Sequence, residues 1–390
     1  MGTNLEKFGQ QLAAVDGMLV TLLARRAAIT SQVGAHKLRE GGGIFRPEIE
    51  QQRLAQSRDL AAQVGLDPEF AASILHQVIA MSCKMQWAMG EGYNHHLVLP
   101  EDEEERLAVL KQNLRSLTEA IAPRWKHSGG DEFPGTAVYN DFEDALVSEQ
   151  VRQMQRRSDG NPTVALDLGT AAGHSARLIA SHFGRVIGYD LSQHMIAEAW
   201  SRGNPSNIEF QQHDLEDGLP HEDDSVDFVM MGQGTASDIP TIRELIREIS
   251  RVLRPGGRFV LSFYNRDALM YTDGYVSLDC DLAAEVNLDL NCLTVHAPSY
   301  RDDDDEVHPA KDHLVYARPY MWGEIEGLMV GTTLQFTRQI TAPTLASVIP
   351  RALMQNEQFS GQIIKLDTVI LNSSSLGAGA YHLMAGEQRF

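Results

Sequence analysis

The stretch from Thr163 to Asp190 constrains the fold of this chain more than any other. It begins with an apolar run of strand length, Val164–Leu168, and passes through a turn of small residues into a helical pattern. A second apolar run then ends in Asp190. Two such runs on either side of a helical period predict a strand, a helix and a second strand. The sequence therefore predicts an α/β fold here.

Three small residues, Gly169, Ala171 and Gly173, alternate through this turn. Small side chains allow a ligand to approach the backbone at the start of a helix. Asp190 follows Asp167 by 23 residues, and a carboxylate at the tip of the second strand can accept hydrogen bonds from both hydroxyls of a ribose. This geometry suits any adenine nucleoside. A dinucleotide-binding unit and a crossover without a ligand remain alternatives at this point.

The spacing Asp-x-Gly-x-Ala-x-Gly places an acid two residues before the first glycine. It resembles motif I of the class I methyltransferases that use S-adenosylmethionine, whose free amino group suits an acid better than a pyrophosphate does. The run Ile249–Val260 resembles the motif of that family that follows the fourth strand and its helix. The resemblance implies a Rossmann-like, seven-stranded sheet with S-adenosylmethionine as the cofactor. It also implies these cofactor-binding residues: Asp167, Gly169, Thr170, Ala171, Gly173, Asp190, Leu191, Met195, His213, Asp214, Leu215 and Gly232.

Candidates for the acceptor side come from three segments. Tyr139 and Asn140 lie just before an expected helix over 143–157, where the family folds over the methionine end of the cofactor. Gln233 follows the fourth strand and can orient an acceptor by hydrogen bonding. Residues 265–320 are rich in tyrosine and histidine, and we interpret them as an acceptor lid. His296 and His313 are candidate general bases there, with a purely structural role as the alternative. We predict no metal site.

The N-terminal residues 5–37 show apolar residues at spacings of three and four, which is typical of a helix that pairs with another helix. Arg26 interrupts this apolar row, and Lys37 lies about three turns further on the same face. A cation in such a row is costly unless it meets an anion. Pro47 and Asp67-Pro68 open two further helices.

Residues 3–90 resemble the all-helical chorismate mutases, which are intertwined dimers that bind a dicarboxylate between basic side chains. The resemblance places Arg26, Lys37, Glu50, Ser82 and Gln86 on ligand-contacting positions. Two arginines of the family fall here at Gly9 and Ile49, which should weaken recognition of two carboxylates. An active mutase, a dimerisation module and a pocket for another ligand all remain open.

We therefore expect a chorismate mutase-like helical domain over 1–90, a helical connector over 91–135 and a methyltransferase domain over 136–390. The formal charge of −20 argues against nucleic acid and anionic membranes as partners. The three cysteines lack metal-like spacing, which is typical of a reducing compartment. With no apolar run long enough to cross a bilayer and no signal-like N-terminus, we predict a cytoplasmic protein. The heptad row of residues 5–37 predicts a homodimer through the N-terminal helices.

The predicted activity is methyl transfer from S-adenosylmethionine to a small-molecule acceptor, either shikimate-derived or a secondary metabolite. One alternative is a bifunctional chorismate mutase and methyltransferase. A second is an enzyme that cyclises S-adenosylmethionine itself, as azetidine-forming relatives do. A third is a regulator that binds S-adenosylmethionine without turnover. The sequence does not choose among them.

Overall fold

In the computed structural model the chain forms two compact units, Met1–Val98 and Leu99–Phe390. The structure describes residues 4–40, 47–89, 99–125, 134–154, 163–268, 275–277, 283–288, 290–297, 300–301, 307–308, 311–347, 357–372, 377 and 379–389. No helix within these ranges is long and apolar enough to cross a membrane.

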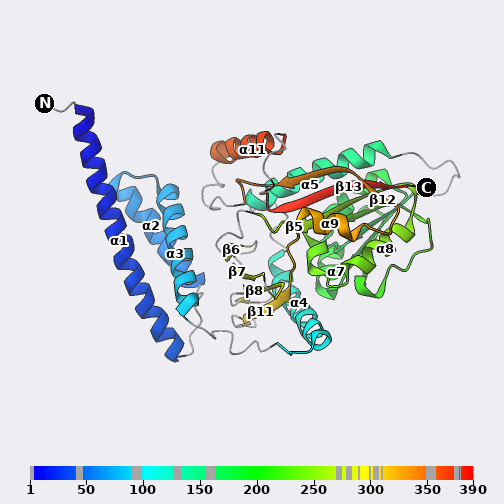
Figure 1. The fold of residues 1–390 in the computed structure, drawn as a ribbon, viewed down its shortest axis with the longest axis horizontal. Coiled ribbons are helices and arrows are strands. Elements are labelled where there is room, and N and C mark those ends of the chain that lie inside the picture. Colours follow the sequence, from blue (N-terminus) through cyan, green and yellow to red (C-terminus); the bar gives the residue numbers. More distant parts are fainter. Residues whose placement is uncertain are drawn as a thin grey trace. The chain divides into compact units, whose positions relative to one another are not determined.

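The first unit consists of three helices, as the sequence predicted. They are α1 (Asn4–Glu40), α2 (Pro47–Val64) and α3 (Pro68–Met89) (Figure 1). Asp67 caps α3, because its Oδ1 accepts a hydrogen bond from the backbone N–H of Phe70 at 2.7 Å. At Gly34 a Cβ would lie 2.9 Å from Cγ of Gln86. A glycine at this position therefore lets α1 approach α3 closely.

The first half of α1 carries apolar side chains that nothing in the described part of the chain covers. We call this surface the α1 apolar stripe. Its members lie on the heptad row that the sequence showed, and their side chains are 49–64% exposed. They are Phe8, Leu12, Val15, Leu19 and Leu22.

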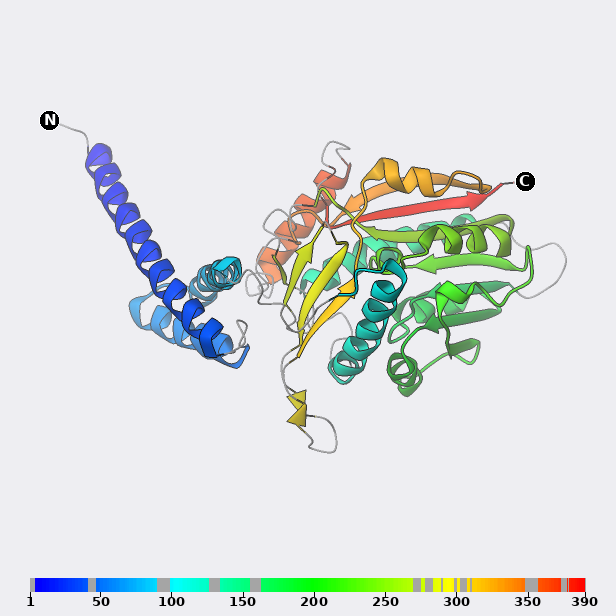
Figure 2. The same ribbon diagram turned by 60° about the horizontal axis from the view of Figure 1, so that its bottom comes forward.

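The second unit is built on a seven-stranded sheet of order β12-β13-β5-β4-β1-β2-β3 (Figure 2). β13 pairs antiparallel with both β5 and β12, which confirms the predicted seven-stranded sheet with its closing hairpin. The strands are β1 (Val164–Leu168), β2 (Arg185–Asp190), β3 (Ile208–Gln212), β4 (Val226–Met231), β5 (Leu253–Tyr264), β12 (Leu334–Ala342) and β13 (Tyr381–Gln388).

Apolar side chains fill both faces of this sheet. Side chains of helices α8 (Ile242–Val252) and α9 (Trp322–Leu328) pack with strand residues in one buried cluster. Side chains of helices α5 (Pro134–Gln153), α6 (His174–Ile179) and α7 (Gln193–Ser201) pack with strand residues in the second buried cluster. Because β1 and β4 are buried on both faces, they are nearly continuous apolar runs. The last helix is α11 (Glu357–Asn372).

Several predicted elements differ in extent. α5 begins at Pro134 rather than at residue 143, so Tyr139 and Asn140 lie within the helix and not before it. One turn apart on α5, the Tyr139 hydroxyl and the Glu143 carboxylate share a hydrogen bond. α4 (Glu103–Trp125) continues past Pro123, since a proline in the last turn removes only one helical hydrogen bond.

The segment that follows β5 and precedes β12 in the sequence forms a second sheet of order β11-β8-β7-β6. Its strands over 283–287 and 292–297 form a hairpin, and Asn291 adopts a left-handed φ of 52° between them. Parts of the predicted lid, and Lys126–Phe133 of the connector, lie outside the described residues. The strands are β6 (Tyr275–Ser277), β7 (Ala283–Asn287), β8 (Cys292–Ala297) and β11 (Lys311–Tyr316), with the pair β9 (Tyr300–Arg301) and β10 (Val307–His308) beside them in sequence.

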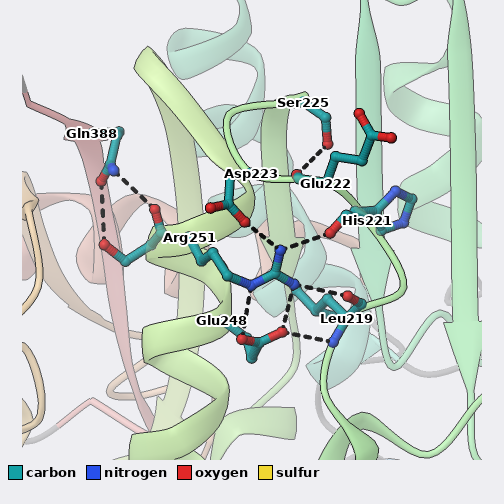
Figure 3. A network of polar contacts seen from close by, with 9 residues as sticks. Leu219, His221, Glu222, Asp223, Ser225, Glu248, Arg251 and Gln388 are labelled. Carbon is teal, nitrogen blue, oxygen red and sulfur yellow. Dashed lines mark hydrogen bonds and ion pairs between the residues drawn. The ribbon is translucent and has the colours of Figure 1, made fainter.

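A polar network around Arg251 fastens the loop after β3 to α8 (Figure 3). The guanidinium donates to both carboxylate oxygens of Glu248 and to Asp223. It also donates to the backbone carbonyls of Leu219 and His221. The neighbouring carboxylates raise the pKa of Arg251 further above its already high ordinary value. The network therefore holds the loop that begins at Asp214.

A buried ion pair explains why the sequence Arg254-Pro-Gly-Gly precedes the core of β5. Asp227 is fully buried, and its two oxygens accept from Arg254 Nε at 2.5 Å and from the backbone N–H of Val164 at 2.8 Å. The pair therefore joins the beginnings of three adjacent strands. Removing one partner of such a pair leaves an uncompensated buried charge.

We expect Asp227→Ala to lower the free energy of unfolding by about 3–5 kcal/mol, measured by urea denaturation. The exposed Asp217 is the matched control, and Asp217→Ala should change stability by less than about 0.5 kcal/mol. The double variant Asp227→Ala/Arg254→Met should recover most of the loss. A loss that persists in the double variant would contradict the ion-pair explanation.

Candidate cofactor and acceptor site

The turn between β1 and α6 is held by Asp167. Its Oδ2 accepts from the Thr170 hydroxyl at 2.7 Å and from the backbone N–H of Ala176 at 3.0 Å. Burial raises the pKa of Asp167 to about 6. The first acid of the motif therefore shapes the turn, while Thr170 is one of its partners.

Two glycines of this turn are required by its geometry. Gly169 and Gly173 have φ values of 76° and 80°, and a Cβ at either would lie 2.5 Å from a side-chain atom of Thr235 or Phe210. Ala171 also adopts a positive φ, of 44°, which is uncommon for a residue with a Cβ. The alternating small residues therefore reflect backbone conformation and close packing.

Asp190 lies at the tip of β2 and faces the turn. Its Oδ2 accepts from the backbone N–H of Ala171 at 2.9 Å, and its Oδ1 accepts from that of Ser192 at 2.8 Å. Burial raises the pKa of this carboxyl group. Each carboxylate oxygen has a second acceptor position, so the pair of oxygens can still accept from two ribose hydroxyls.

The apolar residues beside Asp190 are covered by other elements. Leu191 is half-buried and Met195 is buried. Met195 belongs to a cluster that α4 and the second sheet complete, and Ala171 of the turn packs against it. The buried members of that cluster are Leu117, Ile121, Met195, Leu293, Val295, Val315 and Ala317.

The segment after β3 is positioned by contacts that the sequence did not reveal. Lys111 Nζ of α4 lies 2.5 Å from Asp214 Oδ2, and Arg115 donates to the same oxygen at 3.4 Å. The His213 ring bonds to the carbonyl of Gly218 at 2.6 Å, and Leu215 packs in the core. A role for Asp214 toward an adenine amino group stays a prediction, and Lys111 would share that carboxylate.

Sequence reasoning missed Glu143, a buried acid of α5 at the tip of β4. Its Oε1 accepts from the Tyr139 hydroxyl at 2.7 Å and from the backbone N–H of Gln233 at 3.0 Å. A Cβ at Gly232 would lie 2.6 Å from Oε2, so the carboxylate lies directly against the Gly232 backbone. The available signal was its position one helical turn after Tyr139.

The candidate acceptor-side residues Tyr139, Asn140 and Gln233 come together around this acid. The amide of Gln233 donates to Asn140 Oδ1 at 2.9 Å. The Tyr139 and Ser262 hydroxyls lie 2.8 Å apart, and Ser262 accepts from the backbone N–H of Gly234 at 2.8 Å. The network thus fixes the backbone that follows β4.

The two candidate histidines lie on the second sheet. His313 is buried on β11, where its backbone pairs with Val295. His296 lies on β8 and pairs with Asp312 and Ala283, and its side chain lies outside what the structure describes. Their roles as bases stay predictions.

Burial raises the pKa of Glu143 to about 7, which gives a test of its environment. The folded protein holds this proton more tightly than the unfolded chain, so the stabilisation is complete below the ordinary pKa and is lost as pH rises through about 7. Between pH 5 and 8, the wild type should lose about 3 kcal/mol more unfolding free energy than Glu143→Gln does. Urea denaturation of both proteins across this range measures it. Parallel curves would contradict the assignment.

In the helical unit, the five predicted pocket residues lie on the three helices. Arg26 donates to the Val78 carbonyl at 2.9 Å and to the Ser82 hydroxyl. Cys83 donates to Glu50 at 3.7 Å. Burial raises the pKa of the Cys83 thiol to about 12. The charge of Glu50 adds to this rise, and the charge of Lys37 opposes it.

Gln86 is buried in the same place. Its amide nitrogen donates to the Ser82 carbonyl at 3.3 Å, while its Oε1 has no hydrogen-bond partner among the described residues. A buried amide oxygen without a donor is costly. The pocket therefore has an acceptor available for a ligand that carries a hydroxyl or amine.

Comparison with known proteins matches the two units separately. Residues 166–261 match the family model of the methyltransferase domain, and residues 9–87 match that of chorismate mutase type II. An uncharacterized methyltransferase, YcgJ of Bacillus subtilis, is 35% identical over 25% of this chain and 38% of its own length. Phosphoethanolamine N-methyltransferase 2 of Caenorhabditis elegans is 28% identical over 37% of this chain and 33% of its own length. The 2-phytyl-1,4-naphtoquinone methyltransferase of Synechococcus elongatus is 36% identical over 24% of this chain and 42% of its own length.

The chain thus spans 33–42% of the length of these relatives. Both matches agree with the fold of the unit in which they lie. The chain therefore combines a region similar to chorismate mutase type II with a following region similar to methyltransferase domains.

Proposed function

We propose that this protein transfers the methyl group of S-adenosylmethionine to a small-molecule acceptor. The observation that carries the proposal is the arrangement of Asp190 around the β1–α6 turn. Its carboxylate is half-buried, is aligned by two backbone N–H groups, and lies beside a turn in which Gly169 and Gly173 have left-handed φ values. This is the geometry that a ribose with two free hydroxyls requires.

The charges of the site fit the cofactor. Burial raises the pKa values of Asp167, Asp190 and Glu143, and within the described residues none of the three forms an ion pair with Lys or Arg. Uncompensated buried carboxylates favour a cationic ligand. S-adenosylmethionine has a sulfonium and an ammonium group, and when bound it supplies an already activated methyl group.

The chain's own residues then align the reactants. Asp190 would hold the ribose, Met195 and Leu191 would contact the adenosine, and the Tyr139–Glu143–Gln233 network would fix the backbone beside the methionine end. Holding the acceptor in line with the methyl group accounts for most of the rate gain in such a transfer. The relatives' names include an amine and a quinone as acceptors, so the names alone do not select the acceptor.

Mass spectrometry of the products tests the proposal, with S-adenosylmethionine incubated alone and with an acceptor panel. S-adenosylhomocysteine that forms only with an added acceptor supports methyl transfer. Methylthioadenosine formed without an acceptor would instead show that the cofactor itself is cyclised. Binding of S-adenosylmethionine without any product would favour the regulator.

A bifunctional enzyme remains a second candidate because the helical pocket is assembled. Arg26, Ser82 and Gln86 converge there, and Gln86 offers a buried acceptor. Gly9 and Ile49 provide no guanidinium at the two positions where the family has arginine. Conversion of chorismate to prephenate by the wild type, and its loss in Arg26→Ala, would establish the mutase.

We also propose that the protein is a cytoplasmic homodimer whose helical units pair. The α1 apolar stripe supports this, because contiguous exposed apolar surface on a helix favours a partner. A second copy of the chain presents the same stripe and is the simplest complement to it.

A further inference from the structure

Asp238 is a half-buried acid beside the candidate site that neither the fold nor the cofactor explains. It is the last residue of the 3₁₀ helix Thr235–Asp238, which starts immediately after Gly234 at the tip of β4. In a parallel α/β sheet, ligands bind beyond the carboxyl ends of the strands. Asp238 therefore lies at the end of the sheet where an acceptor has to bind.

The hydrogen bonding of Asp238 is sparse for an acid in this position. Its Oδ2 accepts from the Tyr264 hydroxyl at 3.2 Å, and within the described residues it has no ion pair. Asp167 and Asp190, by contrast, each accept two hydrogen bonds. Burial raises the pKa of Asp238 to about 8, because so little compensates its charge.

Tyrosines from two elements belong to the environment of this acid, and one of them, Tyr264, donates to it. Tyr264 is the last residue of β5, and Tyr316 is the last residue of β11 in the second sheet. Burial raises the pKa of Tyr316, and the charge of Asp238 adds to that rise. The backbone N–H of Arg318 donates to the Ser237 carbonyl at 2.8 Å, while its guanidinium donates to Glu324 at 2.9 Å and lies over the Tyr320 ring.

Tyr264 links Asp238 to the cofactor side. A Cβ at Gly234 would lie 2.1 Å from the Tyr264 ring, so the ring lies directly against the backbone after β4. The same ring packs against the cluster that contains Met195 and Ala171. One aromatic side chain thus separates Asp238 from the residues proposed to hold the adenosine.

We propose that Asp238, together with the rings of Tyr264 and Tyr316, binds the nitrogen of an amine acceptor and removes its proton before methyl transfer. This inference rests on the proposed function and narrows its acceptor to the amines. A carboxylate that has no ion pair within the described residues, and that contacts a tyrosine, favours an ammonium group through charge and cation–π attraction. It disfavours carboxylate or phenolate acceptors, as does the formal charge of −20.

The proposed reaction consists of a proton transfer followed by a methyl transfer. The ammonium group gives one proton to the Asp238 carboxylate, which becomes a carboxylic acid, and a neutral amine with a free electron pair remains. The nitrogen attacks the methyl carbon as the carbon–sulfur bond breaks with its electron pair on sulfur. The products are a methylated ammonium and S-adenosylhomocysteine, and Asp238 returns its proton to solvent. A base with a raised pKa takes a proton from an alkylammonium at moderate cost.

The test compares the wild type, Asp238→Asn and the control Asp224→Asn on a panel of amines with matched alcohols, phenols and carboxylic acids. Asp224 is exposed and has a left-handed φ of 56°, which asparagine tolerates. We expect only amines to be methylated, and we expect Asp238→Asn to lower kcat/KM by about 100-fold or more at pH 7.5. Near pH 10 about a third of an alkylamine is already neutral in solution, so the loss should shrink to about tenfold or less.

Cofactor binding separates this inference from the proposed function. Calorimetry should give the same Kd for S-adenosylmethionine in all three proteins, and a wild type that does not bind it would overturn the proposed function itself. Methylation of oxygen or carbon acceptors, an equal loss at every pH, or binding without turnover of any amine would each overturn the role of Asp238. Should Asp238→Asn fail to fold, Tyr264→Phe removes only the hydrogen bond and should move the acidic limb of the pH–rate profile to higher pH. An unmoved limb would count against the proposal.

Discussion

Asp190→Ala is expected to lower the affinity for S-adenosylmethionine by about 10²- to 10⁴-fold. The wild-type carboxylate is aligned by the backbone N–H groups of Ala171 and Ser192, and two ribose hydroxyls would complete its hydrogen bonding. Each hydrogen bond to a charged group contributes about 1.5–3 kcal/mol. The variant loses both hydroxyl contacts, and calorimetry measures the resulting Kd.

The same substitution also removes the two contacts to the turn, so a second variant is needed to separate the effects. Asp190→Asn keeps an acceptor oxygen and should lose about tenfold in affinity, because it still accepts from one hydroxyl. Glu209→Gln on the next strand is the control, since Glu209 is exposed and pairs with Arg185, and its Kd should not change. An Asp190→Ala protein that binds within threefold of the wild type would refute the cofactor site.

The cofactor turn could be predicted because its determinants are local. The strand, the turn and Asp190 lie within one continuous stretch, and the left-handed φ values of Gly169 and Gly173 are the conformations for which glycine is selected. The seven-stranded sheet was implied by the family resemblance of the motifs, and the structure has it. Elements with a clear apolar period and local turn residues were therefore predicted well.

The residues that were missed act through contacts distant in sequence. Glu143 meets Gln233 across 90 residues, and Lys111 meets Glu216 across 105. No local pattern marks an acid on an amphipathic helix as the partner of a strand tip. Asp238 was missed for the same reason, since its hydrogen bond to Tyr264 spans 26 residues.

In the helical unit the outcome differed. Arg26 in the apolar row was an anomaly visible in the sequence, and the structure explains it, because its guanidinium turns to Val78 and Ser82 of α3. The apolar residues that precede it do not turn inward and are exposed. The same row of α1 thus carries an exposed apolar part and a residue that contacts α3. A helical period alone does not show which part of such a row is exposed.

Leu12→Glu/Leu19→Glu is expected to convert the protein from a dimer to a monomer. Leu12 and Leu19 are 64% and 54% exposed in the single chain, so the substitutions should leave the fold of the unit intact. In a dimer, burying these side chains contributes about 1.5 kcal/mol or more each. Four of them per dimer amount to about 6 kcal/mol, which corresponds to a change of about 10⁴-fold in the dimer dissociation constant.

Sedimentation velocity at micromolar concentration measures the change, with circular dichroism to show that helix content is kept. The matched control is Leu60→Glu/Val64→Glu on α2, whose side chains are equally exposed, at 60% and 69%, but lie outside the α1 apolar stripe. The control should remain dimeric, because it adds the same charges to a surface that we expect to face solvent. Since the stripe lies on the same helix as Arg26, loss of the dimer with unchanged S-adenosylmethionine affinity would show that assembly depends on the helical unit while cofactor binding does not. A monomeric wild type, or a stripe variant that stays dimeric, would remove the physical basis for pairing through α1.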